Sequence, residues 1–119
     1  MALFERGTFT SAAGLTLHWK IECDSLSPED WETIAFASAP HLAPFGDVKG
    51  VPTGGERLVA PFRPYITEGP TLIVDDVWTT GKSMTNFARE HGIADWRGFV
   101  AFARGPLLPG VICFMRTEF

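Results

Sequence analysis

Cysteine, lysine and long apolar runs are scarce in this chain of 119 residues. The two cysteines, Cys23 and Cys113, lie far apart in apolar segments, so we expect free buried thiols in a reducing cytoplasm rather than a disulfide. No stretch resembles a signal peptide or could span a membrane, so we expect no membrane partner. The basic residues are scattered and the net charge is −4, which argues against binding to nucleic acid.

What the chain does contain is an alternation of helical and extended patterns. Its length fits one domain, residues 1–119, with a single core. Residues 8–23 predict two extended segments around a turn at Ala12–Gly14. Ser27 and Pro28 begin a helix that ends at Pro40. The later part of the chain predicts strands at 48–51, 72–75, 98–104 and 110–116, helical runs at 56–60 and 83–91, and a proline-rich connection at 61–70. This order predicts an α/β domain with a mostly parallel sheet of four to five strands and flanking helices.

The most informative stretch reads Thr71-Leu-Ile-Val-Asp-Asp-Val-Trp-Thr-Thr-Gly-Lys-Ser83. An apolar strand runs into Asp75 and Asp76, and a polar turn then leads into a helix. The free backbone N–H groups of a helix N-terminus suit a phosphate, and two carboxylates beside it suit a metal or a pair of sugar hydroxyls. The alternative is that one carboxylate and one hydroxyl only cap the turn. The combination favours a phosphorylated sugar as the ligand.

A second loop of the same kind reads Gly50-Val-Pro-Thr-Gly-Gly-Glu-Arg57. It also follows a strand and precedes a helical run, and its glycines let the backbone approach a ligand closely. Arg57 offers a fork of donors to a second phosphate group. This loop alone is also compatible with an ordinary turn. Paired with the first loop, it predicts two phosphate-bearing ends of a ligand held between adjacent strands.

Together the two loops resemble the type I phosphoribosyltransferases, and the second loop resembles the diphosphate loop of the orotate enzymes. The stretches Gly7–Gly14 and Trp19–Cys23 are similar to the N-terminal hood that covers the base in those enzymes. The resemblance implies a phosphoribosyltransferase fold with a hood at 1–26 and an α/β core at 27–119. It also implies transfer of a 5-phosphoribosyl group from 5-phosphoribosyl-1-diphosphate (PRPP) to a nucleobase, orotate or another pyrimidine, with release of diphosphate. Mg²⁺ and a homodimer are expected from the family.

The resemblance also assigns roles to individual residues. Asp75 and Asp76 would hold the ribose hydroxyls as catalytic residues and reach the metal that PRPP brings. The 5-phosphate would be bound by Thr79, Thr80, Gly81, Lys82 and Ser83, and the diphosphate by Pro52, Thr53, Gly54, Gly55 and Arg57. Phe9, Lys20 and Trp78 are the candidate contacts to the base or the hood. For Trp78, stacking on a base and simple packing remain equal alternatives.

The chain departs from the family between Arg57 and Thr71. The family has an edge strand and a flexible basic loop there, whereas Arg63 is the only basic residue of this short segment. The turn at Ala12–Gly14 also lacks the cation of the orotate hood, which leaves Lys20 or a partner subunit to meet an orotate carboxylate. A non-catalytic protein that binds PRPP or a nucleotide for regulation is therefore the main alternative function.

Two further alternatives receive little support from the residues. A receiver-type phosphotransfer domain needs a lysine late in the sheet, but Lys82 is the last lysine of the chain. A metal site built from His18, His41 and His91 has irregular spacing, and single histidines more often pack or face solvent.

Overall fold

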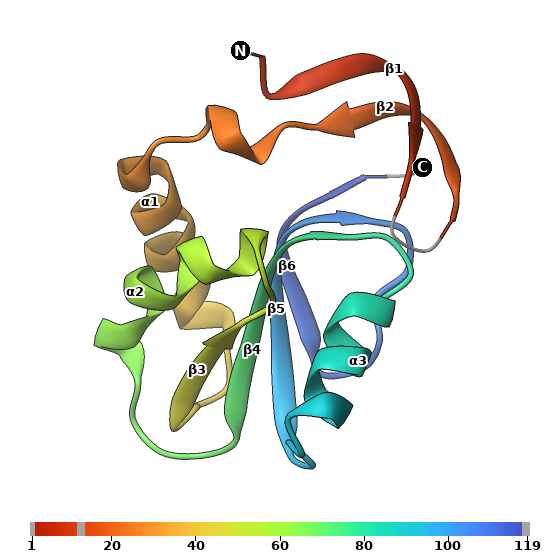
Figure 1. Cartoon of the computed structure of the whole chain (residues 1–119). Helices are drawn as coiled ribbons and strands as arrows, with labels where there is room; N and C mark the ends of the chain where they lie inside the picture. Colours follow the sequence, from red (N-terminus) through yellow and green to blue (C-terminus); the bar gives the residue numbers. More distant parts are fainter. Residues whose placement is uncertain (1, 12–13, 118–119) are drawn as a thin grey trace.

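The computed structural model describes residues 2–11 and 14–117. Ala12 and Ala13, at the tip of the first predicted turn, lie outside the described residues. The chain forms a four-stranded sheet with helices on both faces and a separate two-stranded sheet above it (Figure 1). No helix in the described part of the chain is long and apolar enough to cross a membrane.

The central sheet is parallel throughout and confirms the predicted α/β class. Its spatial order follows the sequence, β3-β4-β5-β6, and all three neighbouring pairs run parallel. Because the strands are parallel, their carboxyl ends meet at one edge, where α/β proteins bind ligands. The strands are β3 (Asp47–Gly50), β4 (Thr71–Trp78), β5 (Trp96–Arg104) and β6 (Val111–Thr117).

Each face of the sheet is covered by its own helices (Figure 1). On one face, α1 (Pro28–Ser38) and the one-turn helix α2 (Val59–Phe62) pack against β4 and β5. On the other face, α3 (Lys82–Glu90) buries Met84 and Phe87 against the sheet. The start of α1 is fixed as predicted: the Ser27 hydroxyl accepts from the Asp30 amide at 3.1 Å, and the Asp30 carboxylate accepts from the Ser27 amide at 2.9 Å.

The hood is an antiparallel hairpin of β1 (Phe4–Thr10) and β2 (Thr16–Ile21). It lies above the carboxyl ends of the central strands and joins α1 through a 3₁₀ turn, η1 (Cys23–Ser25). Leu17 is buried while Thr16 and His18 are exposed, which is the alternation expected of a half-buried strand. The first strand begins at Phe4, several residues before the predicted start.

Several further predicted boundaries differ from the structure. The segment predicted as a connection, 61–70, begins with the end of α2 and a 3₁₀ turn, η4 (Arg63–Tyr65). Proline is compatible with the first turn of a helix, and the fully buried Phe62 packs edge-on against Phe99 at 4.9 Å between ring centres. The second difference is β4, which continues past Asp75 because Val77 and Trp78 pair with β5. The helical run predicted at 56–60 is divided between a 3₁₀ segment, η3 (Gly54–Leu58), and the start of α2.

Both outer strands of the sheet leave an uncovered edge among the described residues. β3 is short and carries Asp47 and Lys49, which form an ion pair at 3.6 Å. β6 is longer and carries Phe114 and Met115, whose exposed fractions are 42% and 47%. Charged, short edges resist pairing with another chain, and apolar ones favour it. The expected homodimer stays a prediction.

Candidate functional site

The carboxylates of Asp75 and Asp76 lie where β4 meets the loops above the sheet. Each carboxylate accepts a hydrogen bond from the next backbone amide, Asp75 from the Asp76 amide and Asp76 from the Val77 amide, both at 2.8 Å. Asp75 is buried and Asp76 half-buried. Successive side chains of a strand point to opposite sides, and each acid accordingly faces a different loop. Asp75 lines the cavity at the turn before α3, whereas Asp76 contacts Gly54.

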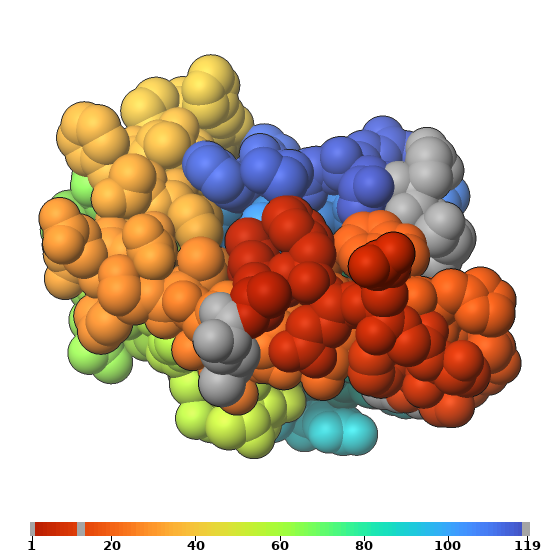
Figure 2. All heavy atoms as spheres, turned by 90° about the horizontal axis from the view of Figure 1, so that it is seen from above, coloured from red at the N-terminus to blue at the C-terminus, as the bar shows by residue number. Residues whose placement is uncertain are grey.

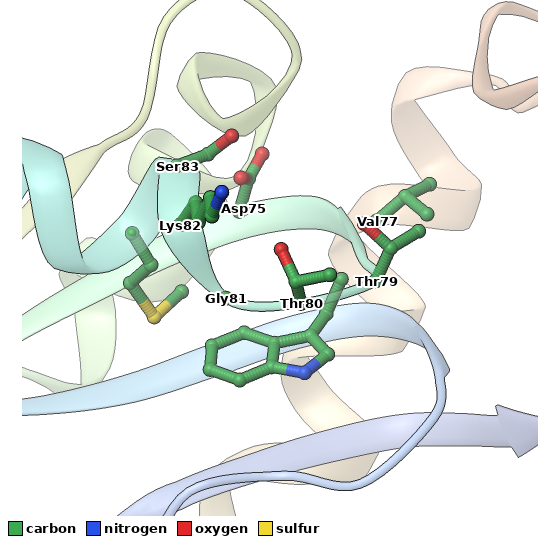
Figure 3. A pocket seen from close by; sticks show the side chains of 9 residues that line it. Asp75, Val77, Thr79, Thr80, Gly81, Lys82 and Ser83 are labelled. Atoms are coloured by element: carbon green, nitrogen blue, oxygen red, sulfur yellow. The ribbon is translucent and has the colours of Figure 1, made fainter. Parts of the chain in front are cut away.

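The turn before α3 is the segment that the sequence predicts to bind a phosphate. A small cavity of about 30 Å³ is lined by Asp75 together with Thr79, Thr80, Gly81, Lys82 and Ser83. Gly81 has φ +86° and precedes the first residue of α3, so the chain turns there in a conformation that favours glycine. The first N–H groups of a helix have no partner within it and point out of its N-terminus. Figure 3 shows Asp75 and Ser83 pointing to the same side of this turn.

The Gly50–Arg57 loop packs directly on the acid-bearing strand. The Val51 amide donates to the Val74 carbonyl at 2.9 Å, and the Gly55 amide donates to the Val51 carbonyl at 2.8 Å. A Cβ atom on Gly55 would collide with the Val74 carbonyl, and one on Gly54 would collide with the Asp76 carboxylate. The Pro52–Thr53 peptide bond is cis. The two predicted loops therefore lie on either side of the acid pair, with glycine required for the close approach.

Arg57 is the last residue of this loop, and its side chain interacts with the segment below the hood. Its Nη2 atom donates to Oδ1 of Asp24 at 2.7 Å, and its guanidinium lies 5.3 Å from the centre of the Trp31 ring. The sequence gives no local signal for this pair, because Asp24 and Arg57 are 33 positions apart.

A second cavity lies between the hood and the turn before α3. It has a volume of about 600 Å³, and Val77, Thr79 and Ser83 line both this cavity and the small cavity described above. The hood lies above the carboxyl ends of the strands (Figure 1), and seen from above in Figure 2 it covers the middle of this face, with η3 and α3 visible along one side. The other lining residues are Thr8, Phe9, Thr10, Ser11, Leu17, Lys20 and Ile21 from the hood and Arg104 from β5.

Arg104 is the functional candidate that the sequence analysis missed. It is the last residue of β5, only 2% of it is exposed, and its guanidinium lies 3.7 Å from the centre of the Trp19 ring. Its Nε and Nη2 atoms have no hydrogen-bond partner among the described residues. Burial lowers the pKa of Arg104. A usable signal existed, because a charged residue ends the strand that follows the acid-bearing strand.

The other hood candidates differ in their surroundings. The Lys20 ammonium lies 5.0 Å from the centre of the Phe9 ring and forms ion pairs with Glu22 at 3.2 Å and Glu5 at 3.6 Å. The hydrogen bond to Glu22 contributes most to the raised pKa of Lys20. Trp78 is 3% exposed, packs between β5 and α3, and donates from Nε1 to the Pro106 carbonyl at 3.0 Å. Of the two alternatives for Trp78, the structure therefore supports packing.

The two cysteines are both free thiols, as expected. Burial, together with the charge of Asp76, raises the pKa of Cys23 to about 12. Cys113 is partly buried on β6, and burial also raises its pKa.

The environment of Asp75 favours its protonated form. Burial, followed by the charge of Asp76 and the hydrogen bond with its side chain, raises the pKa of Asp75 from 3.8 to about 8. A carboxyl group with such a pKa at a pocket is a common feature of functional sites. A cation or a group of hydroxyl donors placed beside Asp75 would lower this pKa again and stabilise the charged form.

We expect the stability of the ligand-free protein to fall as the pH rises from about 4 to about 8. In this range the folded Asp75 keeps a proton that the unfolded chain, with a pKa near 3.8, has lost. The dependence should amount to a few kcal/mol and should level off above pH 8. Urea unfolding at a series of pH values, compared with Asp75→Asn, measures it. An identical pH slope in the variant would contradict the raised pKa.

The acid pair also fits a magnesium ion that arrives with a phosphorylated ligand. Mg²⁺ is commonly held by one or two carboxylates plus substrate phosphates and water. Within residues 2–11 and 14–117, no cluster of three or more His, Cys, Asp or Glu side chains could hold a metal by itself. His91 instead stacks on Phe87 and hydrogen-bonds to its carbonyl at 3.0 Å. The histidine metal site is therefore excluded for the described residues.

Comparison with known proteins places the fold. Neither a family profile nor a curated protein sequence matches the chain. The structure of orotate phosphoribosyltransferase from Aeropyrum pernix is similar with a TM-score of 0.74 at 18% identity, over 96% of this chain and 88% of that chain. The orotate phosphoribosyltransferase of Mycobacterium tuberculosis gives a TM-score of 0.65 at 12% identity, over 95% and 89%. A hypoxanthine-guanine-xanthine phosphoribosyltransferase gives 0.51 at 14% identity, over 76% of each chain.

The chain therefore has the type I phosphoribosyltransferase fold, as the two loops predicted. Among these similar structures, orotate enzymes match over most of their length as well as most of this chain.

Proposed function

We propose that the protein binds PRPP and Mg²⁺ and transfers the 5-phosphoribosyl group to a pyrimidine base, orotate or a similar carboxylated ring, releasing diphosphate. The observation that carries this proposal is the position of the acid pair between the loops 50–57 and 79–83, next to a cavity under the hood. The fold supports the proposal, because the similar structures are phosphoribosyltransferases.

In this proposal the two loops hold the two ends of PRPP. The amides and hydroxyls of Thr79–Ser83 bind the 5-phosphate at the N-terminus of α3. The close-packed backbone of Thr53–Gly55 binds the diphosphate, and Asp75 and Asp76 hold the ribose hydroxyls between them. Mg²⁺, when bound, would neutralise charge on the diphosphate.

The chemistry is a substitution at C1 of the ribose. The lone pair of a ring nitrogen of the base forms the C1–N bond, and the electron pair of the C1–O bond leaves with diphosphate. The proton of that nitrogen passes to water or to the departing diphosphate. Positive charge develops on the ribose as the C1–O bond weakens. The carboxylates of Asp75 and Asp76 stabilise that charge, because they are fixed beside the ribose by their hydrogen bonds to the backbone. Holding both reactants in one cleft supplies further rate enhancement.

The cavity under the hood suits a base that carries a negative charge. The Nε and Nη2 atoms of Arg104 donate no hydrogen bond to any described residue, and such buried donors favour an anionic acceptor. A guanidinium binds a carboxylate through two parallel hydrogen bonds. Lys20 lines the same cavity, but Glu5 and Glu22 already offset its charge. Arg104 would therefore take the place of the cation that is absent from the turn at Ala12–Gly14, and would bind the carboxylate of the base.

A panel of bases with PRPP and Mg²⁺ tests the function and the role of Arg104. Mass spectrometry should detect a nucleotide from orotate and much less from uracil, which has the same ring without the carboxylate. Arg104→Gln should raise KM for orotate by about 10- to 100-fold, the cost of a hydrogen bond to a charged group, and should leave KM for PRPP nearly unchanged. Equal use of orotate and uracil by the unmodified protein would contradict the assignment of Arg104.

A non-catalytic protein that binds PRPP or a nucleotide is the second candidate. The observation in its favour is the course of the chain between Arg57 and Thr71, which is taken up by the end of η3, α2, η4 and a short link to β4. Phe62 in this segment is fully buried in the core, so the segment is committed to packing. A flexible lid often excludes water and completes such sites. Robust release of diphosphate with any base would rule out this candidate.

A further inference from the structure

Arg57 connects the diphosphate loop to the base of the hood. It follows Gly54 and Gly55 in η3, whereas its partner Asp24 belongs to η1, which comes directly after β2. The pair is joined by the 2.7 Å hydrogen bond between Nη2 of Arg57 and Oδ1 of Asp24. One ion pair therefore joins the loop proposed to bind diphosphate to the segment that carries the hood.

This ion pair is placed where an anionic ligand can displace it. The side chain of Asp24 is 65% exposed and that of Arg57 is 27% exposed. Exposed ion pairs contribute little to stability and are screened by water and salt. A diphosphate carries several negative charges, and a guanidinium binds phosphate oxygens through paired hydrogen bonds. Diphosphate beside Gly54 would thus compete effectively with one carboxylate.

The charges around Arg57 agree with such an exchange. Burial acts to lower the pKa of Arg57, but the hydrogen bond to Asp24 and the negative charges of Asp76 and Asp24 raise it overall. The guanidinium is therefore charged and lies within the field of Asp76, the carboxylate that contacts Gly54. The guanidinium lies over the Trp31 ring, which α1 holds in the core, and this contact keeps it at the loop when its hydrogen-bond partner changes.

We propose that Asp24 is a positioning residue that holds Arg57 in the ligand-free protein and releases it to the diphosphate group on binding. The release removes the ion pair between η3 and η1, so that the presence of diphosphate alters the contacts at the base of the hood. Asp24 then limits the affinity for diphosphate and favours its departure. This inference rests on the proposed function, because it requires diphosphate to bind at Thr53–Gly55.

Calorimetric titration with magnesium diphosphate tests the competition. Asp24→Asn should bind diphosphate about two- to fivefold more tightly than the unmodified protein, as expected for removal of an exposed ion pair. Arg57→Gln should bind it more weakly, and adding Asp24→Asn to Arg57→Gln should change nothing further. Asp95→Asn is the matched control. Asp95 forms an exposed ion pair with Arg97 at 3.1 Å at the start of β5, the end of the strand opposite the proposed site, so this variant should leave the affinity unchanged.

Hydrogen exchange provides a readout that a purely structural role would not move. Magnesium diphosphate should speed exchange in peptides covering residues 14–26 of the unmodified protein, and should not do so in Arg57→Gln. If the unmodified protein binds diphosphate and Asp24→Asn binds it equally or more weakly, Asp24 does not compete for Arg57 and the inference is overturned. If the folded, unmodified protein binds no diphosphate, the proposed function fails together with the inference.

Discussion

Replacing both acids, as Asp75→Asn with Asp76→Asn, should abolish phosphoribosyl transfer while the protein stays folded. The two carboxylates are the only charged side chains at the end of β4, and they face the two loops proposed to hold the ends of PRPP. Loss of one group that stabilises charge in a transition state commonly costs about 10²- to 10³-fold in rate. We therefore expect the rate of transfer to fall by at least about 10³-fold, measured as nucleotide formed from PRPP and the preferred base.

Folding of the double variant must be checked separately, and the structure predicts that it is retained. Asparagine keeps an oxygen that can accept the hydrogen bonds now donated by the Asp76 and Val77 amides. Removal of a buried carboxyl whose pKa lies near 8 should also raise stability above that pH. Transfer at the original rate by the folded double variant would show that the acid pair is not the catalytic centre.

Gly55→Ala should disrupt both the fold and the site. A Cβ atom at this position would collide with the Val74 carbonyl and would lie 3.0 Å from the Asp75 Cα atom, both of which belong to the backbone of β4. Backbone atoms of a central strand cannot move aside as a side chain can, so we expect a loss of at least about 2 kcal/mol in the free energy of unfolding. Binding of magnesium PRPP should be lost in parallel, because the diphosphate loop would be pushed away from the acids.

Gly92→Ala is the control for a general cost of replacing glycine. Gly92 follows the end of α3 with φ +64°, and a Cβ atom there would meet no atom within 4 Å. Alanine at such a position costs about 1 kcal/mol through backbone strain alone. Gly55→Ala should therefore unfold more easily and bind PRPP more weakly than Gly92→Ala. A Gly55→Ala protein as stable as Gly92→Ala, with normal PRPP binding, would show that the loop does not depend on close contact with β4.

Much of the site could be predicted from the sequence because its signals are local. The apolar run before Asp75, the glycine at position 81 and the cap at Ser27 each act within a few residues, and the structure shows each in the expected element. The parallel sheet then brings the two loops together, since β3 and β4 are neighbours.

The features that escaped prediction depend on contacts between distant residues. Arg104 is a candidate only because β5 pairs with β4 and the hood places Trp19 over its guanidinium. Trp78 packs in the core because β4 is extended by its pairing with β5. The helical turns that contain Pro61 and Pro64 form because Phe62 is buried in the core, although a proline-rich segment usually indicates a connection.

Calorimetric titration of the folded protein with PRPP in the presence of Mg²⁺ tests the central claim most directly. The structure predicts saturable binding of one PRPP per chain, lost in the Asp75→Asn, Asp76→Asn double variant and weakened when Mg²⁺ is removed. Absence of binding by the folded, unmodified protein would contradict the assignment of the two loops and the acid pair as a PRPP site.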